Sequence, residues 1–221
     1  MKKIIIIGAG GHSKVLIDII EKEAKYELVG LIDDYFKAGT IVMGYEIIGS
    51  MKTFNEVINE QKIYGGVVAL GDNSKRSVVA GKINSSNPSF CFVNCIHPKS
   101  TIGKNVNIGT GNVFMPGTII NSGSTIENHC ILNTNSSLDH DCKMKNYSSI
   151  APNVTIGGNT DIGEYSAIGI GTNIFHNISI GKNCIIGGGS LVTKDTMDNS
   201  VYFGSPCQFI RSHKLGTKYL K

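Results

Sequence analysis

One short stretch of this 221-residue chain concentrates titratable side chains, because Asp139, His140 and Asp141 follow one another directly. Imidazole is the side chain whose ordinary pKa suits proton transfer near neutral pH. A neighbouring carboxylate that accepts a hydrogen bond from one ring nitrogen fixes the tautomer and makes the other nitrogen a better base. The stretch therefore indicates a general base at His140. A solvated surface histidine between two acids is the alternative interpretation.

A second candidate lies at the start of the chain, where the glycine-rich segment Gly8–Ser13 follows the apolar run Ile4–Ile7. A glycine-rich turn between a strand and a helix lets backbone N–H groups approach a phosphate. Asp33 and Asp34 end the next predicted strand, and Gly71 ends a later one. The third glycine of the dinucleotide fingerprint is missing, so the pattern is weak evidence for NAD. A purely structural tight turn remains the alternative, and a strand-end turn is the simplest role for Gly71.

The elements that must position this segment alternate between strand and helix over residues 1–98. Alternation of this kind implies a parallel sheet covered by helices. The expected strands are Ile4–Ile7, Leu28–Ile32, Gly66–Leu70 and Phe90–Val93, and the expected helices are 12–25, 54–60 and 75–83.

From Ile102 onward the hydrophobic period changes to six. The large apolar residues at this spacing are Ile102, Ile108, Phe114, Ile120, Ile126, Leu132, Leu138, Met144, Ile150, Ile156, Ile162, Ile168, Ile174, Ile180, Ile186 and Val192. The residue four positions after each is small or apolar, with Asn112 as the exception. This period fits neither an α-helix nor a hairpin sheet. It predicts a coil of short parallel strands with a corner every six residues, built on a repeat over residues 102–197.

In such a coil the large apolar side chain fills the interior, and the small residue packs beside it near the corner. Glycine and asparagine tolerate the backbone angles that the corners require. Each coil pairs with the next at about 4.8 Å.

The hexapeptide pattern resembles the left-handed β-helix of the hexapeptide-repeat acyltransferases, in which three hexapeptides form one coil of eighteen residues. Ile131–Thr134 and Leu138–Cys142 resemble the active-site segment of one bacterial subgroup. That subgroup comprises N-acetyltransferases acting on nucleotide-linked amino sugars and the related sialic acid O-acetyltransferases. Further segments agree with it in the same order along the chain, namely Gly8–Ser13, Ile96–Pro98, Gly187–Gly189 and Gly204–Pro206.

The resemblance implies an α/β, Rossmann-like nucleotide-sugar domain over residues 1–98 and an all-β left-handed parallel β-helix over residues 99–197. A tail over residues 198–221 is expected to pack on the end of the coil or on a neighbour. The implied activity is acetyl-CoA-dependent acetylation of the amino group of a nucleotide-linked sugar, expected to be a UDP-linked 4-amino sugar. O-acetylation of sialic acid or a related sugar is the alternative. The family is trimeric, with active sites at subunit junctions.

The resemblance also assigns residues. His140 matches the general base, Asp141 matches its acidic neighbour, and Asn133 matches a residue near the sugar. Gly158 and Gly188 match backbone contacts to acetyl-CoA. At the position of Ser149 the family often has a histidine that donates to the thioester carbonyl, so the oxyanion-stabilising group is open here.

By the same analogy the first domain contacts the nucleotide. Gly10, Gly11 and His12 lie near the pyrophosphate or base, and Asp33 and Asp34 lie near the ribose or uracil. Positions eighteen apart stack in such a coil, so Gly158 is expected next to His140.

The composition narrows the other possibilities. Charged residues are 17% of the chain, and the net charge is +4. The basic residues are scattered, so no nucleic-acid partner is expected. Charges interrupt every apolar run well before membrane-spanning length, so no membrane partner is expected and the protein is expected to be cytoplasmic. The six cysteines form no CxxC pair, which favours buried or half-buried thiols without a disulfide or a metal.

Two other classes of function compete with acetyl transfer. A carbonic anhydrase-type metal lyase on the same coil needs three histidines, two of them five residues apart, and no such pair exists here. A non-catalytic, nucleotide-sensing trimer is the other class; the clustered acids around His140 argue against it, while Ser149 leaves it open. His129 and His176 are expected at the surface, and His213 is expected to be solvated.

Overall fold

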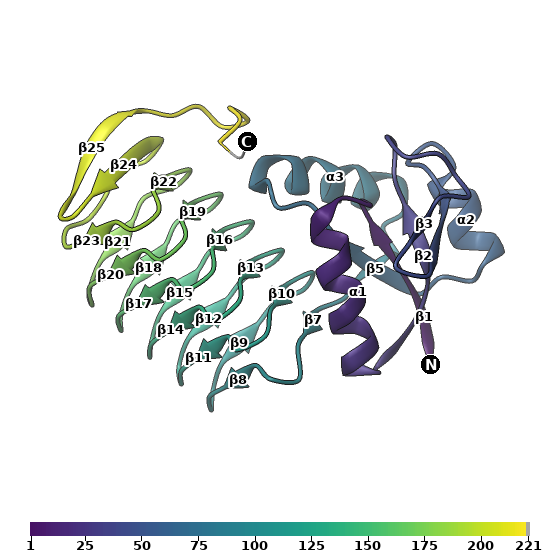
Figure 1. The fold of residues 1–221 in the computed structure, drawn as a ribbon, viewed down its shortest axis with the longest axis horizontal. Helices are drawn as coiled ribbons and strands as arrows, with labels where there is room; N and C mark the ends of the chain where they lie inside the picture. Colours follow the sequence, from purple (N-terminus) through teal and green to yellow (C-terminus); the bar gives the residue numbers. More distant parts are fainter. Residues whose placement is uncertain (220–221) are drawn as a thin grey trace.

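The computed structural model describes residues 1–219, and it shows two unlike halves side by side (Figure 1). An α/β unit forms the first half. A row of short parallel strands wound into a coil forms the second, and the C-terminal segment returns from the end of the coil toward the first half (Figure 1). The predicted fold class, an α/β domain followed by a left-handed parallel β-helix, is confirmed.

The N-terminal sheet has the strand order β3-β4-β2-β1-β5-β6, and all its pairs are parallel except β3 with β4. Its strands are β1 (Lys2–Ile7), β2 (Tyr26–Ile32), β3 (Ile41–Val42), β4 (Tyr45–Gly49), β5 (Gly65–Val68) and β6 (Cys91–Phe92). The helices are α1 (Gly11–Glu23), α2 (Phe54–Glu60) and α3 (Asn73–Ser86). The β3–β4 hairpin was not predicted.

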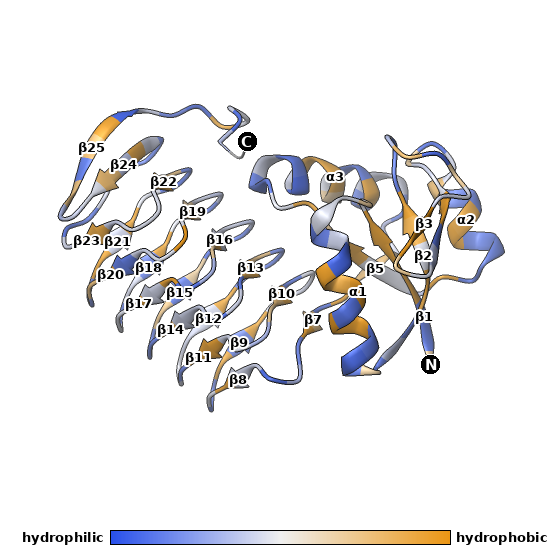
Figure 2. Cartoon of the chain, viewed as in Figure 1, coloured by the Kyte–Doolittle hydropathy of each residue, from blue (hydrophilic) through white to orange (hydrophobic). Residues whose placement is uncertain are grey.

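Strand β1 is apolar on both faces because helices cover both sides of the sheet. Ile4 and Ile6 pack with Leu16 of α1, whereas Ile5 and Ile7 belong to a second core that contains α2. Figure 2 shows the strand as hydrophilic at its start, beside the N-terminus, and apolar beyond it. The carboxyl ends of β1, β2 and β5 therefore meet at one edge of a rigid sheet.

The coil consists of three sheets, and each strand pairs with the strand eighteen residues further on. The first sheet contains β7 (Cys95–Ile96), β10 (Val113–Phe114), β13 (Ile131–Leu132), β16 (Ser149–Ile150), β19 (Ala167–Ile168) and β22 (Ile185–Ile186). The second contains β8 (Thr101–Ile102), β11 (Ile119–Ile120), β14 (Ser137–Leu138), β17 (Thr155–Ile156), β20 (Asn173–Ile174) and β23 (Leu191–Val192). The third contains β9 (Asn107–Ile108), β12 (Thr125–Ile126), β15 (Lys143–Met144), β18 (Asp161–Ile162) and β21 (Ser179–Ile180). The pairing begins at β7, one strand before the first residue of the predicted repeat.

The corners of the coil follow one rule. The third residue after an inward aliphatic adopts a left-handed backbone conformation, as at Gly117, Asn135 and Asp141, with φ of 74°, 56° and 57°. The residue after it is small or apolar in every corner except at Asn112, and in most corners it is buried. The hydroxyl of Ser136, for example, donates to the carbonyl of Asn133, so a polar side chain is satisfied inside the coil.

The two halves share a core. Helix α1 lies between the sheet and the first rungs, where Leu16 and Ile20 belong to the same apolar cluster as Val113 and Ile131. One apolar cluster therefore extends from the sheet through α1 into the first rungs of the coil.

Arg76 of α3 joins the halves by polar contacts. Its side chain is only 1% exposed. The Nε atom donates to the carbonyl of His129 at 2.9 Å, and Nη2 donates to the carbonyl of Tyr147 at 3.1 Å and to Oδ1 of Asn73 at 2.7 Å. Nη1 donates to the carbonyl of Leu70 at 2.8 Å. Within residues 1–219 no carboxylate forms an ion pair with this guanidinium, so carbonyl dipoles and one amide oxygen stabilise a buried cation.

The prediction that His129 lies at the surface is wrong. It is 4% exposed, with its ring edge-on to Phe92 at 4.6 Å and parallel to Tyr147 at 5.0 Å between centroids. Burial, together with the charge of Arg76, lowers the pKa of His129 to about 4. His213 is also buried, at 5% exposure, rather than solvated. His129 is covered by Phe92 and Tyr147, which are distant in sequence, so a local pattern does not show its burial.

The end of the coil is covered by a hairpin of β24 (Ser200–Gly204) and β25 (Cys207–Ser212). Strand β24 pairs with β22, so the last rung of the first sheet has no open edge. Among the described residues the six cysteines are free, and all are buried or half-buried, as predicted. Across residues 1–219 no helix combines the length and apolar character needed to cross a membrane.

Replacing Arg76 with Met tests its role at the junction. The variant leaves several buried acceptors without their donor, so we expect a loss of about 3 kcal/mol in the free energy of unfolding. Urea unfolding followed by circular dichroism measures it. Lys75→Met, at an exposed position on the same helix, is the control and should stay within about 0.5 kcal/mol of the parent. Equal stability of the two variants would contradict the role.

Candidate active site

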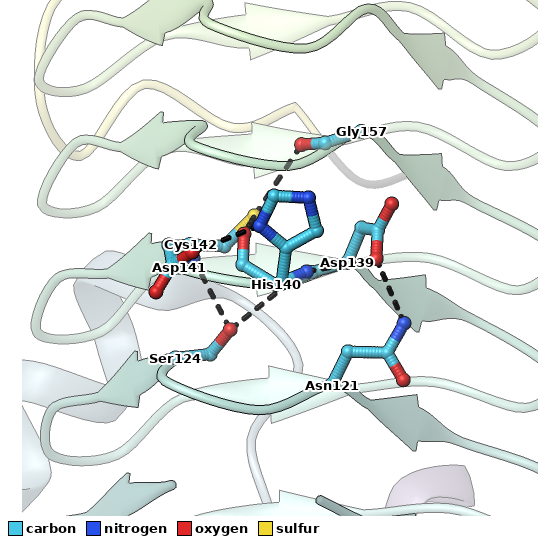
Figure 3. A network of polar contacts seen from close by, with 7 residues as sticks. All are labelled: Asn121, Ser124, Asp139, His140, Asp141, Cys142 and Gly157. Atoms are coloured by element: carbon cyan, nitrogen blue, oxygen red, sulfur yellow. Dashed lines mark hydrogen bonds and ion pairs between the residues drawn. The ribbon is translucent and has the colours of Figure 1, made fainter. Parts of the chain in front are cut away.

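The predicted base stands at the corner between β14 and β15, on the outside of the coil (Figure 3). Asp141 occupies the left-handed corner position, and this conformation returns its carboxylate toward the preceding side chain. Its Oδ2 lies 2.8 Å from Nδ1 of His140, and the two side chains are 59% and 55% exposed. The carboxylate therefore holds the proton on Nδ1 and leaves Nε2 as the basic nitrogen.

Asp139 completes the cluster on the other side of the imidazole. Its Oδ1 accepts hydrogen bonds from Nδ2 of Asn121 and from the backbone N–H of His140, each at 2.8 Å. These bonds, that of Asn121 first, lower the pKa of Asp139 and keep it ionised. The hydrogen bond to Asp141, followed by the two negative charges, raises the pKa of His140 above its usual value.

Two glycines provide the space for the His140–Asp141 pair, because neither carries a side chain. A Cβ atom at Gly158, on the next rung, would lie 2.7 Å from Nε2 of His140. A Cβ atom at Gly123, on the previous rung, would collide with Oδ1 of Asp141. Below the pair, Oγ of Ser124 accepts from the backbone N–H of Cys142 at 3.1 Å and donates to the carbonyl of Asp139 at 2.9 Å. The imidazole is thus positioned by its own rung and by both neighbours (Figure 3).

A cavity of about 420 Å³ lies on a different side of the coil, over the first sheet. Its polar residues come from the first half and the nearer rungs: His12, Gly71, Asn133, Ser149 and Tyr219. Its remaining wall is largely apolar and extends along the rungs toward the cap: Ile131, Ile150, Ala151, Ala167, Ile168, Gly169, Ile170, Ile185, Ile186, Gly187, Gly188 and Phe203. The cavity therefore suits a long ligand with a polar head and an apolar arm.

His12 brings a free nitrogen to the polar end. Its Nε2 is buried and has no hydrogen-bond partner among residues 1–219. Burial, and then the charge of Arg76, lowers the pKa of His12 to about 4. The imidazole is therefore neutral at physiological pH, and its Nε2 is available to a ligand. An unpartnered buried nitrogen is costly in the absence of a ligand.

The glycine-rich turn is built as the sequence indicates. Gly10 is the N-cap residue of α1, and the backbone N–H of Ala9 donates to Oδ2 of Asp33 at 2.7 Å. The other oxygen of Asp33 accepts from the backbone of Tyr35, and Asp34 accepts from the backbone N–H of Met51 at 2.8 Å. Both acids therefore shape the loop beside the turn. Their expected contacts with a ribose or a base stay a prediction.

The structure divides the predicted site residues between two places. His12, Gly71, Asn133, Ser149 and Gly188 line the cavity, with Gly10 and Gly11 at the start of the helix beside it. The base and its neighbours, His140, Asp141 and Gly158, lie at another corner, and among the described residues His140 does not line the cavity. No three His, Cys, Asp or Glu side chains within residues 1–219 are grouped so that they could hold a metal ion.

Most of the apolar wall was not predicted as part of the site, and neither were Phe203 and Tyr219. Phe203 reaches the cavity because strand β24 of the cap pairs with β22. Tyr219 reaches it because the C-terminal segment turns back toward α3. The burial of Arg76 at a predicted helix was likewise not indicated by its sequence position.

Comparison with known proteins places this geometry in a family. The family model described as the PglD N-terminal domain matches residues 3–83. The acetyltransferase domain of PglB from Neisseria gonorrhoeae, solved in complex with acetyl coenzyme A, is 30% identical, with a TM-score of 0.87 over 95% of this chain and 99% of that one. The chain belongs to the hexapeptide-repeat acetyltransferases.

Two further members of these acetyltransferases are informative. PerB from Caulobacter crescentus, solved in complex with CoA and GDP-perosamine, is 29% identical and has a TM-score of 0.88 over 96% of this chain and 98% of that one. The UDP-N-acetylbacillosamine N-acetyltransferase of Bacillus subtilis (strain 168) is 32% identical over 116 residues. That alignment spans about half the length of each protein, 52% of this chain and 52% of the curated relative.

Gly158→Ala tests the space beside the imidazole. The added methyl would displace the ring, so we expect the rate of acetyl transfer to fall more than about tenfold while the melting temperature changes little. Gly81→Ala is the control, because a Cβ at that helical position meets nothing within 4 Å. It should keep full activity and gain about 0.5–1 kcal/mol in stability. Full activity of Gly158→Ala would show that the ring position is unimportant.

Asp141→Asn tests the electrostatics of the pair. The pKa of His140 is raised chiefly by Asp141, so loss of that charge should lower it, and the neutral imidazole should persist to a lower pH. Titration of the His140 ring resonances by NMR in the free protein measures the shift. Asp18→Asn, on the distant helix α1, should leave the His140 titration unchanged. An unaltered titration in Asp141→Asn would contradict the hydrogen bond.

Proposed function

We propose that this protein transfers an acetyl group from acetyl-CoA to the amino group of a nucleotide-linked sugar, with His140 as the general base. The observation that carries the proposal is the 2.8 Å contact between Nδ1 of His140 and Oδ2 of Asp141 on the outer face of the coil. It leaves Nε2 as the basic nitrogen of an exposed ring, and Gly158 beside it carries no side chain that would occupy this space. A base of this kind is what amine acylation uses.

The transfer is direct. The sugar amine attacks the carbonyl carbon of the thioester, and Nε2 of His140 takes the proton that the nitrogen loses. The tetrahedral intermediate then collapses, the carbon–sulfur bond breaks, and the proton passes to the CoA sulfur. No covalent enzyme intermediate is required, in keeping with the buried, unreactive state of Cys142, whose pKa burial raises to about 11.

The cavity provides places for both substrates. Its apolar wall, extending along the rungs to Gly188, suits the pantetheine arm of acetyl-CoA, and the polar end at Asn133 and His12 suits the sugar. The N-terminus of α1 at Gly10 and Gly11 offers backbone N–H groups to the diphosphate. Relatives solved with acetyl coenzyme A, or with CoA and GDP-perosamine, support the choice of these two substrates.

The His140 base and the cavity lie on different sides of the same coil, and this separation supports an oligomer of the chain. A base at one corner and a cavity over another face of the same coil meet when a second copy packs against the first, so we propose a homotrimer with the reaction at each junction. The proposed acceptor is a UDP-linked 4-amino sugar. The name of the Bacillus subtilis relative supports the UDP linkage, whereas the GDP-perosamine complex of PerB makes a GDP-linked sugar the competing acceptor.

O-acetylation of a sugar hydroxyl is the second candidate. Galactoside O-acetyltransferases of Lactococcus lactis and Escherichia coli share 52% and 45% identity with this chain, although over only 44 and 58 residues. A hydroxyl needs the base more strongly than an amine does, so the same pair would serve it. The acceptor alone distinguishes the two candidates.

The test is acetyl transfer to a panel of UDP- and GDP-linked 4-amino sugars and to sialic acid, followed by CoA release. We expect a UDP-linked amino sugar to be the best acceptor, and His140→Ala to lower kcat at least about a hundredfold because the proton acceptor is lost. Lys75→Met should behave like the parent. Unchanged kcat in His140→Ala would refute the base, and preference for sialic acid would favour the second candidate.

A further inference from the structure

The C-terminal segment 213–219 links the cap of the coil to helix α3 in the first half of the molecule. After β25 it leaves the cap and runs back to the start of α3 (Figure 1). Residues 214–218 are exposed, whereas His213 at its base is buried and Tyr219 is partly buried. The rings of these two residues are nearly perpendicular, in a T-shaped arrangement with centroids 6.4 Å apart. The segment is thus an exposed strap fixed at both ends.

The hydroxyl of Tyr219 is fixed by the junction between the halves. Its oxygen accepts from the backbone N–H of Asn73 at 3.1 Å. The side chain of Asn73 in turn donates to the carbonyls of Tyr165 and Ser166 and accepts from Arg76. A network buried between α3 and the coil therefore determines where this hydroxyl lies.

That place is the polar end of the cavity. Tyr219 lines it together with Ser149, Asn133 and His12. Ser149 belongs to β16, between the rung of Asn133 and the rungs of the apolar wall. Tyr219 and Ser149 therefore lie where the polar head and the apolar arm of a bound ligand would join.

The protonation state of Tyr219 allows its hydroxyl to donate a hydrogen bond. Burial raises the pKa of Tyr219, although the Asn73 N–H and the Ser149 hydroxyl oppose this effect. The group is therefore a neutral phenol at physiological pH. A phenol accepts and donates at the same time, so the contact with Asn73 uses an acceptor position and the proton is directed elsewhere.

We propose that Tyr219 is a catalytic residue of the strap, which donates a hydrogen bond, alongside Ser149, to the carbonyl oxygen of the acyl group in the cavity. The inference rests on the proposed acetyl transfer. Negative charge develops on that oxygen as the amine attacks, and donors placed in advance stabilise it. For a ligand whose arm follows the apolar wall, the thioester lies at the junction where these two hydroxyls stand.

Tyr219→Phe tests the donor while it retains the ring. We expect kcat for acetyl transfer to fall at least about tenfold, with KM for acetyl-CoA within about threefold, since the lost bond forms mainly in the transition state. Leu215→Ala, an exposed residue of the same strap, is the matched control and should keep the parent kcat. Melting temperatures of both variants report any loss of folding.

The outcomes separate the two hypotheses. Parent-like kcat in Tyr219→Phe, with an active parent protein, overturns the role of Tyr219 and leaves acetyl transfer standing. A rise in KM or a fall in melting temperature with unchanged kcat shows a packing role and also overturns it. A parent protein inactive on every acceptor of the panel refutes the proposed function and, with it, the donor.

Discussion

The left-handed corner is the constraint on which both the coil and its chemistry depend. A chain that turns every six residues needs one residue per corner with positive φ, and most side chains disfavour that conformation. Asparagine and glycine fill most corners, but Asp141 fills the one beside His140. The backbone that turns the coil also returns this carboxylate to the imidazole. The His140–Asp141 pair therefore forms at a corner of the repeat where an aspartate takes the place of the asparagine found at many other corners.

A second constraint joins the halves. The guanidinium of Arg76 contacts carbonyls of two coil corners, one loop of the sheet and the side chain of Asn73, and so connects the first half to the coil. Burial, and then the charge of Arg76, lowers the pKa of His12 and of His129, so both imidazoles are neutral. One buried cation therefore contributes both to the geometry of the cavity and to its electrostatics.

The regular parts of the fold were predictable from the sequence because they are set locally. The six-residue period correctly placed the buried apolar side chains from Phe114 to Val192, whereas Ile102 is exposed and Ile108 is half-buried in the first rung. Helix α2 was predicted with the observed bounds. Helix α3 starts two residues before the prediction, where Asp72 caps it by accepting from the N–H of Lys75 at 2.9 Å, a signal present in the sequence. Asn112, the exception in the repeat, is buried in the same slot and satisfies its amide with Glu127 and Cys130.

The rest could not be predicted because it depends on contacts between distant segments. His129 is buried by β6 and by the stack with Tyr147, neither of which its own neighbours in the sequence indicate. Tyr219 reaches the cavity through the path of an exposed strap, and the β3–β4 hairpin has a strand of only two residues. In the candidate site, the sequence indicated the His140 cluster and the turn at Gly10, but not that they face different sides of the coil.

A parallel β-helix can in principle have any number of rungs. In this protein the strap limits that number. Each added rung would move the cap about 4.8 Å further from α3, while the segment between Ser212 and Tyr219 stays the same. An insertion of eighteen residues would preserve the register of the sheets and yet detach the last aromatic ring from Asn73. The length of this short segment therefore limits the number of coils, because only a coil of the present length lets Tyr219 line the cavity.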